Sequence, residues 1–123
     1  MNIEEAREAC LTIKGASEST PFGDDVLVYK VMDKMFAYVG LTRHEGYFLL
    51  NLKCDPEKAI ELRETYPDIV PGYHSNKKYW NSVRLESGVP RSVIKELIQH
   101  SVDEVVKKLP KKKQEEYNNL REE

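Results

Sequence analysis

The sequence predicts an α+β fold, a two-layer sandwich in which one antiparallel sheet carries the N- and C-terminal helices on one face. Apolar residues recur at three- and four-residue steps near both ends of the 123-residue chain, which is typical of amphipathic helices. Between these ends, short β-branched and aromatic runs alternate in hydrophobicity and are separated by turn residues. The expected order is helix, three strands, helix, strand, helix.

The first helix is expected over residues 3–14. Asn2 and Glu5 have the spacing of a capping box at its start, and Gly15 is placed to end it. The stretch 16–25 is rich in Ser, Pro, Gly and Asp, so it is expected to be a loop. The apolar face of the helix comprises Ile3, Ala6, Cys10 and Ile13.

Three strands of an antiparallel meander are expected next, over residues 26–32, 35–41 and 47–54. Asp33-Lys34 is expected to close the first hairpin, although neither residue is glycine. Strict alternation puts Met35 on one face with Ala37 and Val39. The third strand has the clearest pattern, with Phe48, Leu50, Leu52 and Cys54 on the apolar face, and Asn51 and Lys53 on the other.

A short helix is expected to begin with Asp55 as N-cap and Pro56 as its first residue, and to end before Pro67. A polar loop over residues 67–78 follows, with a short strand around Ile69-Val70. The strand 79–85 places Trp80, Ser82 and Arg84 opposite Tyr79, Asn81, Val83 and Leu85. The longest helix, over residues 90–108, has a core stripe of Ile94, Leu97, Ile98, Ser101, Val105 and Leu109.

The composition predicts one cytoplasmic domain. A single domain is expected over residues 1–113, followed by a polar tail, 114–123, and partial order at best is expected from residue 111 on. No apolar run approaches the ~18 residues of a spanning helix, and the acidic N-terminus is unlike a signal peptide. Cys10 and Cys54 stand alone, whereas small secreted domains usually contain several disulfides. The charge is unevenly distributed along the chain. Residues 1–68 hold 8 basic and 13 acidic side chains, whereas residues 69–113 hold 10 basic and 4 acidic side chains.

The stretch 71–80 is the strongest candidate for a binding site. It combines the single tryptophan, Trp80, with His74, Asn76, Lys77 and Lys78, and no carboxylate lies between Asp68 and Glu86. Lysines neutralise phosphates and aromatic rings stack on unpaired bases, so this combination suits nucleic acid. The alternative is that Trp80 packs at the sheet edge and the lysines are merely exposed.

Other candidate sites have simpler explanations. The lysines of 107–113 could contact phosphates, but they also complement a helix C-terminus. Acidic side chains in the first third could bind a hard cation, although no ligand spacing matches a known site. No nucleotide-binding or hydrolase motif is present, and a Cys54–His74 nucleophile and base is the weakest hypothesis. We therefore expect no catalytic residue, no metal site and no cofactor.

Several short stretches, in order, resemble the bacterial MmcQ/YjbR family. They include Lys34-Met35-Phe36, residues 52–57, Pro71-Gly72-Tyr73-His74 and His100-Ser101, and the resemblance covers roughly residues 1–113. The family usually has methionine where this chain has Ser75, and often has tyrosine where it has Val102. The resemblance implies a CyaY-like fold and DNA binding, and it brings no catalytic residues.

The resulting hypothesis is a non-enzymatic DNA-binding module, expected to be monomeric and without membrane association. Two alternatives stay open: a metal-binding protein, by fold analogy with frataxin-type proteins, and a small-molecule or protein-binding domain that uses the 71–80 stretch as a pocket. The residues assigned to DNA are Lys53, His74, Asn76, Lys77, Lys78, Trp80 and Arg84.

Overall fold

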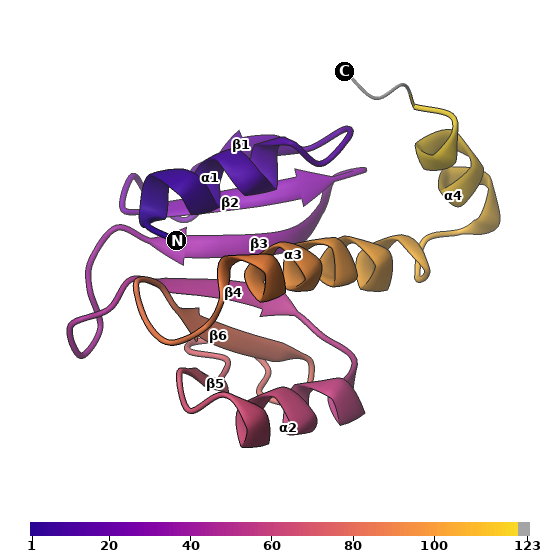
Figure 1. The fold of residues 1–123 in the computed structure, drawn as a ribbon. Helices are drawn as coiled ribbons and strands as arrows, with labels where there is room; N and C mark the ends of the chain where they lie inside the picture. Colours follow the sequence, from indigo (N-terminus) through magenta and orange to yellow (C-terminus); the bar gives the residue numbers. More distant parts are fainter. Residues whose placement is uncertain (121–123) are drawn as a thin grey trace.

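One antiparallel sheet with strand order β1-β2-β3-β4-β6-β5 forms the centre of the computed structural model, which describes residues 1–120. Helices α1 and α3 lie on the same face of this sheet (Figure 1), which confirms the predicted α+β architecture. The strands are β1 Ser17–Ser19, β2 Val26–Val31, β3 Lys34–Gly40, β4 Leu49–Lys53, β5 Ile69–Pro71 and β6 Trp80–Arg84. The helices are α1 Ile3–Leu11, α2 Pro56–Thr65, α3 Arg91–Val106 and α4 Lys111–Asn118.

The core lies between the sheet and the helices, where the alternation of the sequence placed it. Leu50 and Leu52 of β4 pack with Val83 of β6 against Ile94 and Ile98 of α3, and all five are at most 2% exposed. Burying each such side chain stabilises the fold by about 1.5–3 kcal/mol. The opposite alternation leaves Asn51, Ser82 and Trp80 on the other face of the sheet, as predicted.

A β-bulge in β3 breaks the alternation that the sequence suggested. The register passes from Tyr29↔Ala37 to Lys30↔Met35, so Phe36 has no partner in β2. Phe36 and Ala37 are therefore both buried in the core. The prediction that Met35 shares a face with Ala37 and Val39 is wrong, because the extra residue turns Met35 out of the core.

The first hairpin turns one residue earlier than predicted. Met32 and Asp33 both have positive φ, 49° and 64°, and Val31 pairs with Lys34. Two central residues with positive φ are typical of the type I′ turn that matches strand twist. The position of this turn could not be predicted from the sequence, because neither Met32 nor Asp33 is glycine, the residue that usually marks positive φ.

The stretch expected to be a loop over residues 16–25 contains the short edge strand β1. Glu18 of β1 accepts a hydrogen bond from the Tyr29 hydroxyl at 2.7 Å and pairs with Arg7 of α1 at 3.0 Å. The Arg7 guanidinium and the Tyr29 hydroxyl hold the pKa of the Glu18 carboxyl below its usual range. These contacts attach β1 to the sheet and to α1, which compensates for its weak strand composition.

The starts of the first two helices agree with the capping signals. Asn2 and Glu5 form the predicted capping box of α1, and Asp55 caps α2 through the backbone N–H groups of Glu57 and Lys58. Helix α1 ends at Leu11, three residues short of the predicted end, and its C-cap is Thr12 instead of a residue next to Gly15. None of the helices within residues 1–120 is both long and apolar enough to span a membrane.

The C-terminal segment is more ordered than expected. Residues 111–118 form α4, and Tyr117 is buried, with its hydroxyl 3.1 Å from the Lys14 carbonyl. The predicted tail, 114–123, is thus helical through Asn118, and residues 121–123 lie outside the described part of the chain.

Candidate functional site

The segment 72–79, which we call the 72–79 loop, is bound to the face of the sheet opposite the helices. Tyr38 of β3 donates its hydroxyl hydrogen to the Tyr73 carbonyl at 2.7 Å, and burial raises the pKa of this phenol. The Tyr73 backbone N–H donates to Ser82 Oγ of β6 at 2.9 Å. The loop is therefore positioned by side chains of two strands.

Two buried polar residues support this attachment from beneath. The Ser82 hydroxyl donates to Asn51 Oδ1 of β4, and Asn51 Nδ2 donates to the Tyr38 and Leu49 carbonyls at 3.2 Å each. Buried polar groups stabilise a fold when their hydrogen bonds are satisfied, and they then hold one geometry. This network explains why Asn51 and Ser82, both at most 3% exposed, interrupt otherwise apolar strands.

The 72–79 loop also makes its own hydrogen bonds. Lys77 Nζ donates to the Gly72 carbonyl at 2.8 Å, and Asn76 Oδ1 accepts from the Lys78 backbone N–H at 2.9 Å. His74 has a positive φ of 58°, which is uncommon for a residue other than glycine. The loop is thus an ordered structure whose polar side chains serve its own conformation.

Between the loop and the sheet lies a hollow of about 520 Å³, which we call the Trp80 cavity. The His44 and Tyr73 rings are stacked with centroids 4.2 Å apart, and the Tyr38 and Trp80 rings are 5.5 Å apart. Ser75 also lines the cavity, and its buried hydroxyl lies close to the Tyr38 hydroxyl. The rings that line the cavity are Phe22, Tyr38, His44, Tyr73, His74 and Trp80.

The structure brings together only part of the predicted site. His74 and Trp80 both line the Trp80 cavity, whereas Asn76, Lys77 and Lys78 do not. Arg84 lies near Asp68 at 3.4 Å and Glu45 at 3.8 Å, so its charge is already paired. Lys53 lines a different hollow with Lys34 and Lys108.

Sequence reasoning missed several residues of the cavity. Tyr38 has a signal in the sequence, since it alternates with the core residues Ala37 and Val39 in β3. Phe22 and His44 have none, because they come from loops whose positions depend on the tertiary fold. Phe22 is 67% exposed at the cavity.

Cys54 and His74 do not meet. Cys54 lies on the helix side of the sheet near Val83 and Leu97, whereas His74 lines the cavity on the other face. Burial raises the pKa of the Cys54 thiol to about 11, so it remains protonated at neutral pH. A protonated thiol is a poor nucleophile, and the geometry does not support a Cys–His pair.

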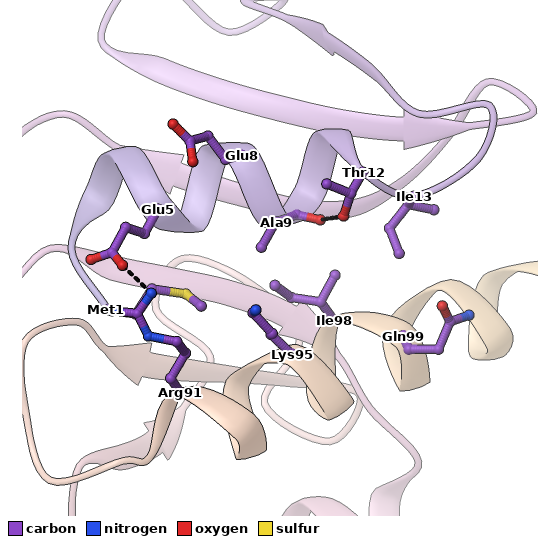
Figure 2. A pocket seen from close by; sticks show the side chains of 10 residues that line it. All are labelled: Met1, Glu5, Glu8, Ala9, Thr12, Ile13, Arg91, Lys95, Ile98 and Gln99. Carbon is purple, nitrogen blue, oxygen red and sulfur yellow. Dashed lines mark hydrogen bonds and ion pairs between the residues drawn. The ribbon is translucent and has the colours of Figure 1, made fainter. Parts of the chain in front are cut away.

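A second hollow, of about 370 Å³, lies between α1 and α3 and contains carboxylates considered for metal binding (Figure 2). Glu5 forms an ion pair with Arg91 across this groove, while Glu4 pairs with Arg7 at 3.1 Å. Within residues 1–120, no group of three or more His, Cys, Asp or Glu side chains could hold a metal ion. The metal-binding alternative therefore has no candidate centre in the described chain.

Comparisons with known proteins agree with the resemblance seen in the sequence. A family model described as YjbR matches residues 11–103. The uncharacterised protein YjbR of Escherichia coli K12 is 34% identical over 113 residues, covering 92% of this chain and 94% of its own length. The uncharacterised protein YbdF of Escherichia coli O157:H7 is 35% identical over 111 residues, which cover 90% of this chain and 89% of YbdF. The crystal structure of Deinococcus radiodurans protein DR2400, with domain DUF419, is similar at a TM-score of 0.85 and 36% identity, covering 98% of this chain and 90% of that one.

Proposed function

The chain belongs to the YjbR family, and from that premise we propose that it is a non-enzymatic binding module whose ligand occupies the Trp80 cavity. The ligand class that fits is a small planar heteroaromatic ring. The observation that carries this proposal is the ring-lined hollow of about 520 Å³ held open by the 72–79 loop. Sites for small molecules are commonly hollows of about 300–1,000 Å³ with mainly apolar walls and a few polar groups.

The chemistry of the walls selects the ligand. Flat side chains such as Trp80 and Tyr73 stack on flat ligands, and His44 and His74 in the lining can exchange hydrogen bonds with a ring nitrogen or carbonyl. Asp25 and Arg43 also line the cavity, with opposite charges, so the walls carry no strong excess of either sign. A neutral or weakly charged ring is therefore favoured over a highly charged one.

The support from geometry for DNA is weaker. Of the four cations assigned to DNA, Arg84 is paired with carboxylates and Lys77 bonds within the loop. Lys53 and Lys78 make no ion pair within residues 1–120, but neither lines the Trp80 cavity, and Lys53 lies in a separate hollow. A duplex needs a row of free cations along its phosphates. DNA binding, cytoplasmic location and a monomeric state stay predictions.

The ligand proposal is tested by two-dimensional NMR with adenine, indole and quinazoline as probes. Rings of about ten heavy atoms are expected to bind with about millimolar affinity, from roughly −0.4 kcal/mol per atom. They should shift the Trp80 indole N–H and the amides of 73–75. Phe22→Ala should weaken binding, whereas Ile60→Ala, which removes an exposed apolar side chain from α2, should not. Shifts that avoid the cavity, or none, would refute the proposal.

The fluorescence of Trp80 distinguishes a ring ligand from DNA. Under the proposal, a short duplex at low salt leaves the fluorescence of Trp80 unchanged. A fluorescence change that weakens with salt at a log–log slope of about −2 or steeper, and that Lys78→Ala reduces, would instead favour DNA as the ligand.

A further inference from the structure

Four lysines from distant parts of the sequence meet at one end of the sheet. Lys34 begins β3, Lys53 ends β4, Lys78 precedes β6 and Lys108 follows α3. In Figure 1 the β2–β3 hairpin and the ends of β4 and α3 all lie at this end of the molecule. Lys53 and Lys78 were among the residues that the sequence assigned to DNA, and Lys108 belongs to the 107–113 lysines that were also considered for phosphates. Their grouping with Lys34 could not be predicted, because it arises from the topology.

Three of these side chains line a single hollow. Lys34, Lys53 and Lys108 surround a space of about 380 Å³, closed on the apolar side by Val105 and Leu109, and we call it the lysine hollow. The Tyr79 ring is in contact with two ammonium groups, with Lys108 Nζ 4.9 Å and Lys78 Nζ 5.4 Å from its centroid. The ring contact keeps both lysines near the hollow.

Within residues 1–120, none of these four lysines is joined to a carboxylate by an ion pair. Glu104, whose charge also acts on Lys53, is held by Lys107 at 2.6 Å. Burial, and then the like charges of Lys108 and Lys34, lower the pKa of Lys53. A group of like charges is stabilised when an anion enters among them.

We infer that the lysine hollow binds a compact polyphosphate oxyanion, with Lys34, Lys53 and Lys108 acting as point charges around it. Lysine is a common partner of phosphoryl oxygens, and an anion of high charge density suits several ammonium groups at once. Three lysines around one hollow converge on a single anion, whereas a nucleic-acid backbone would need cations spread along a line. The lysine hollow and the Trp80 cavity share only Met35 in their linings, and none of the three lysines lines the Trp80 cavity, so this inference does not rest on the proposed function.

Calorimetric titration of the full chain with pyrophosphate at low ionic strength tests the inference. The double variant Lys34→Gln/Lys108→Gln should weaken binding by about tenfold or more, since two charge-assisted contacts are lost. The control Lys95→Gln/Lys112→Gln removes the same charge from exposed positions that do not line the hollow, and should change affinity less than about twofold. Equal weakening in both variants, or no binding by the unaltered chain, would overturn the inference.

Two further measurements test whether lost binding reflects misfolding and whether the ligand is a nucleic acid. Without pyrophosphate the Lys34→Gln/Lys108→Gln variant should unfold at the same or a higher temperature, because like-charge repulsion is reduced, so lost binding would not reflect misfolding. A short DNA duplex supplies the other source of phosphoryl groups. If the duplex binds through the same lysines and excess pyrophosphate fails to displace it, the compact anion is the wrong ligand and the backbone of a nucleic acid is the right one.

Discussion

Gly72 shows how closely the 72–79 loop is fitted to the sheet. It is buried, and its backbone N–H donates to the Trp80 carbonyl at 2.9 Å. A Cβ at this position would lie 2.8 Å from Trp80 Cβ and 2.9 Å from the Trp80 carbonyl oxygen. The glycine is needed here because the backbone of the loop approaches β6 directly.

Gly72→Ala is therefore expected to destabilise the fold by about 1–3 kcal/mol, the usual cost of forcing an extra carbon into a packed site. Equilibrium unfolding in urea measures this. Gly40→Ala is the matched control, because no atom lies within 4 Å of a Cβ built there. Equal effects of the two substitutions would show that the loop does not approach β6 so closely.

His100 is a second residue whose environment has a measurable consequence. The Asp55 backbone N–H donates to His100 Nε2 at 3.2 Å, which requires a neutral imidazole. Burial, followed by the charge of Lys58, lowers the pKa of His100 below its ordinary value of 6.5. His100 therefore binds a proton less readily in the folded state than in the unfolded state.

The stabilisation from neutral His100 is fully present above the unfolded value of 6.5 and is lost as the pH falls through the lower folded value. Unfolding free energies measured from about pH 7.5 to about pH 5 should thus decrease more in the unaltered chain than in His100→Gln. Parallel curves for the two proteins would contradict the prediction.

At the scale of elements, α3 is fastened to the sheet by polar contacts as well as by its apolar stripe. The Ser101 hydroxyl accepts the Lys53 backbone N–H at 2.9 Å and donates to the Phe36 carbonyl at the β3 bulge. Ser101 and His100 together accept hydrogen bonds from the backbone N–H groups of Lys53 and Asp55, at the connection between β4 and α2. The separate stretches 52–57 and 100–101, quoted for the family resemblance, thus form one junction.

Ser101→Ala should destabilise the protein by about 1–3 kcal/mol, because the Lys53 N–H and the Phe36 carbonyl would be buried without this partner. Ser92→Ala, at an exposed position of the same helix, should change stability by no more than about 0.5 kcal/mol. Urea unfolding of both variants provides the comparison, and a small effect at Ser101 would mean that the apolar stripe alone holds α3.

The whole molecule has one core, although its charge is divided between regions. A continuous cluster of buried apolar side chains extends from Ala6 and Cys10 of α1 to Tyr117 of α4. Arg84 and Arg91 have carboxylate partners, while the lysines around Tyr79 have none among residues 1–120. The uneven charge of the sequence is thus partly averaged by folding and partly concentrated at the lysine end of the sheet.

Because α1, α3, α4 and the sheet share this core, the chain should unfold in a single transition. Trp80 fluorescence reports the face that carries the 72–79 loop, and far-UV circular dichroism reports the helices on the other. The two signals should have the same urea midpoint. An earlier fluorescence transition would show that the loop and its cavity open separately from the core.

Local pattern and chemistry determined the architecture of this protein. Capping residues placed the starts of α1 and α2, and the alternation in β4 and β6 assigned the faces correctly, because these depend on neighbours within a few residues. The composition of the stretch 71–80 also drew attention to His74 and Trp80, which line the Trp80 cavity. The bulge at Phe36 and the turn at Met32-Asp33 could not be predicted, because packing rather than residue type selected those conformations.

Contacts between distant residues decided what the sequence left open. Helix α4 has little apolar surface of its own, and it is held because Tyr117 reaches the Lys14 carbonyl from about a hundred residues away. Likewise, Arg84 is paired and Lys53 joins Lys34 and Lys108 only once the sheet is assembled. The availability of a charge depends on its neighbours in space, so the sequence identified charged residues, and only the tertiary structure decided which of them remain available for a ligand.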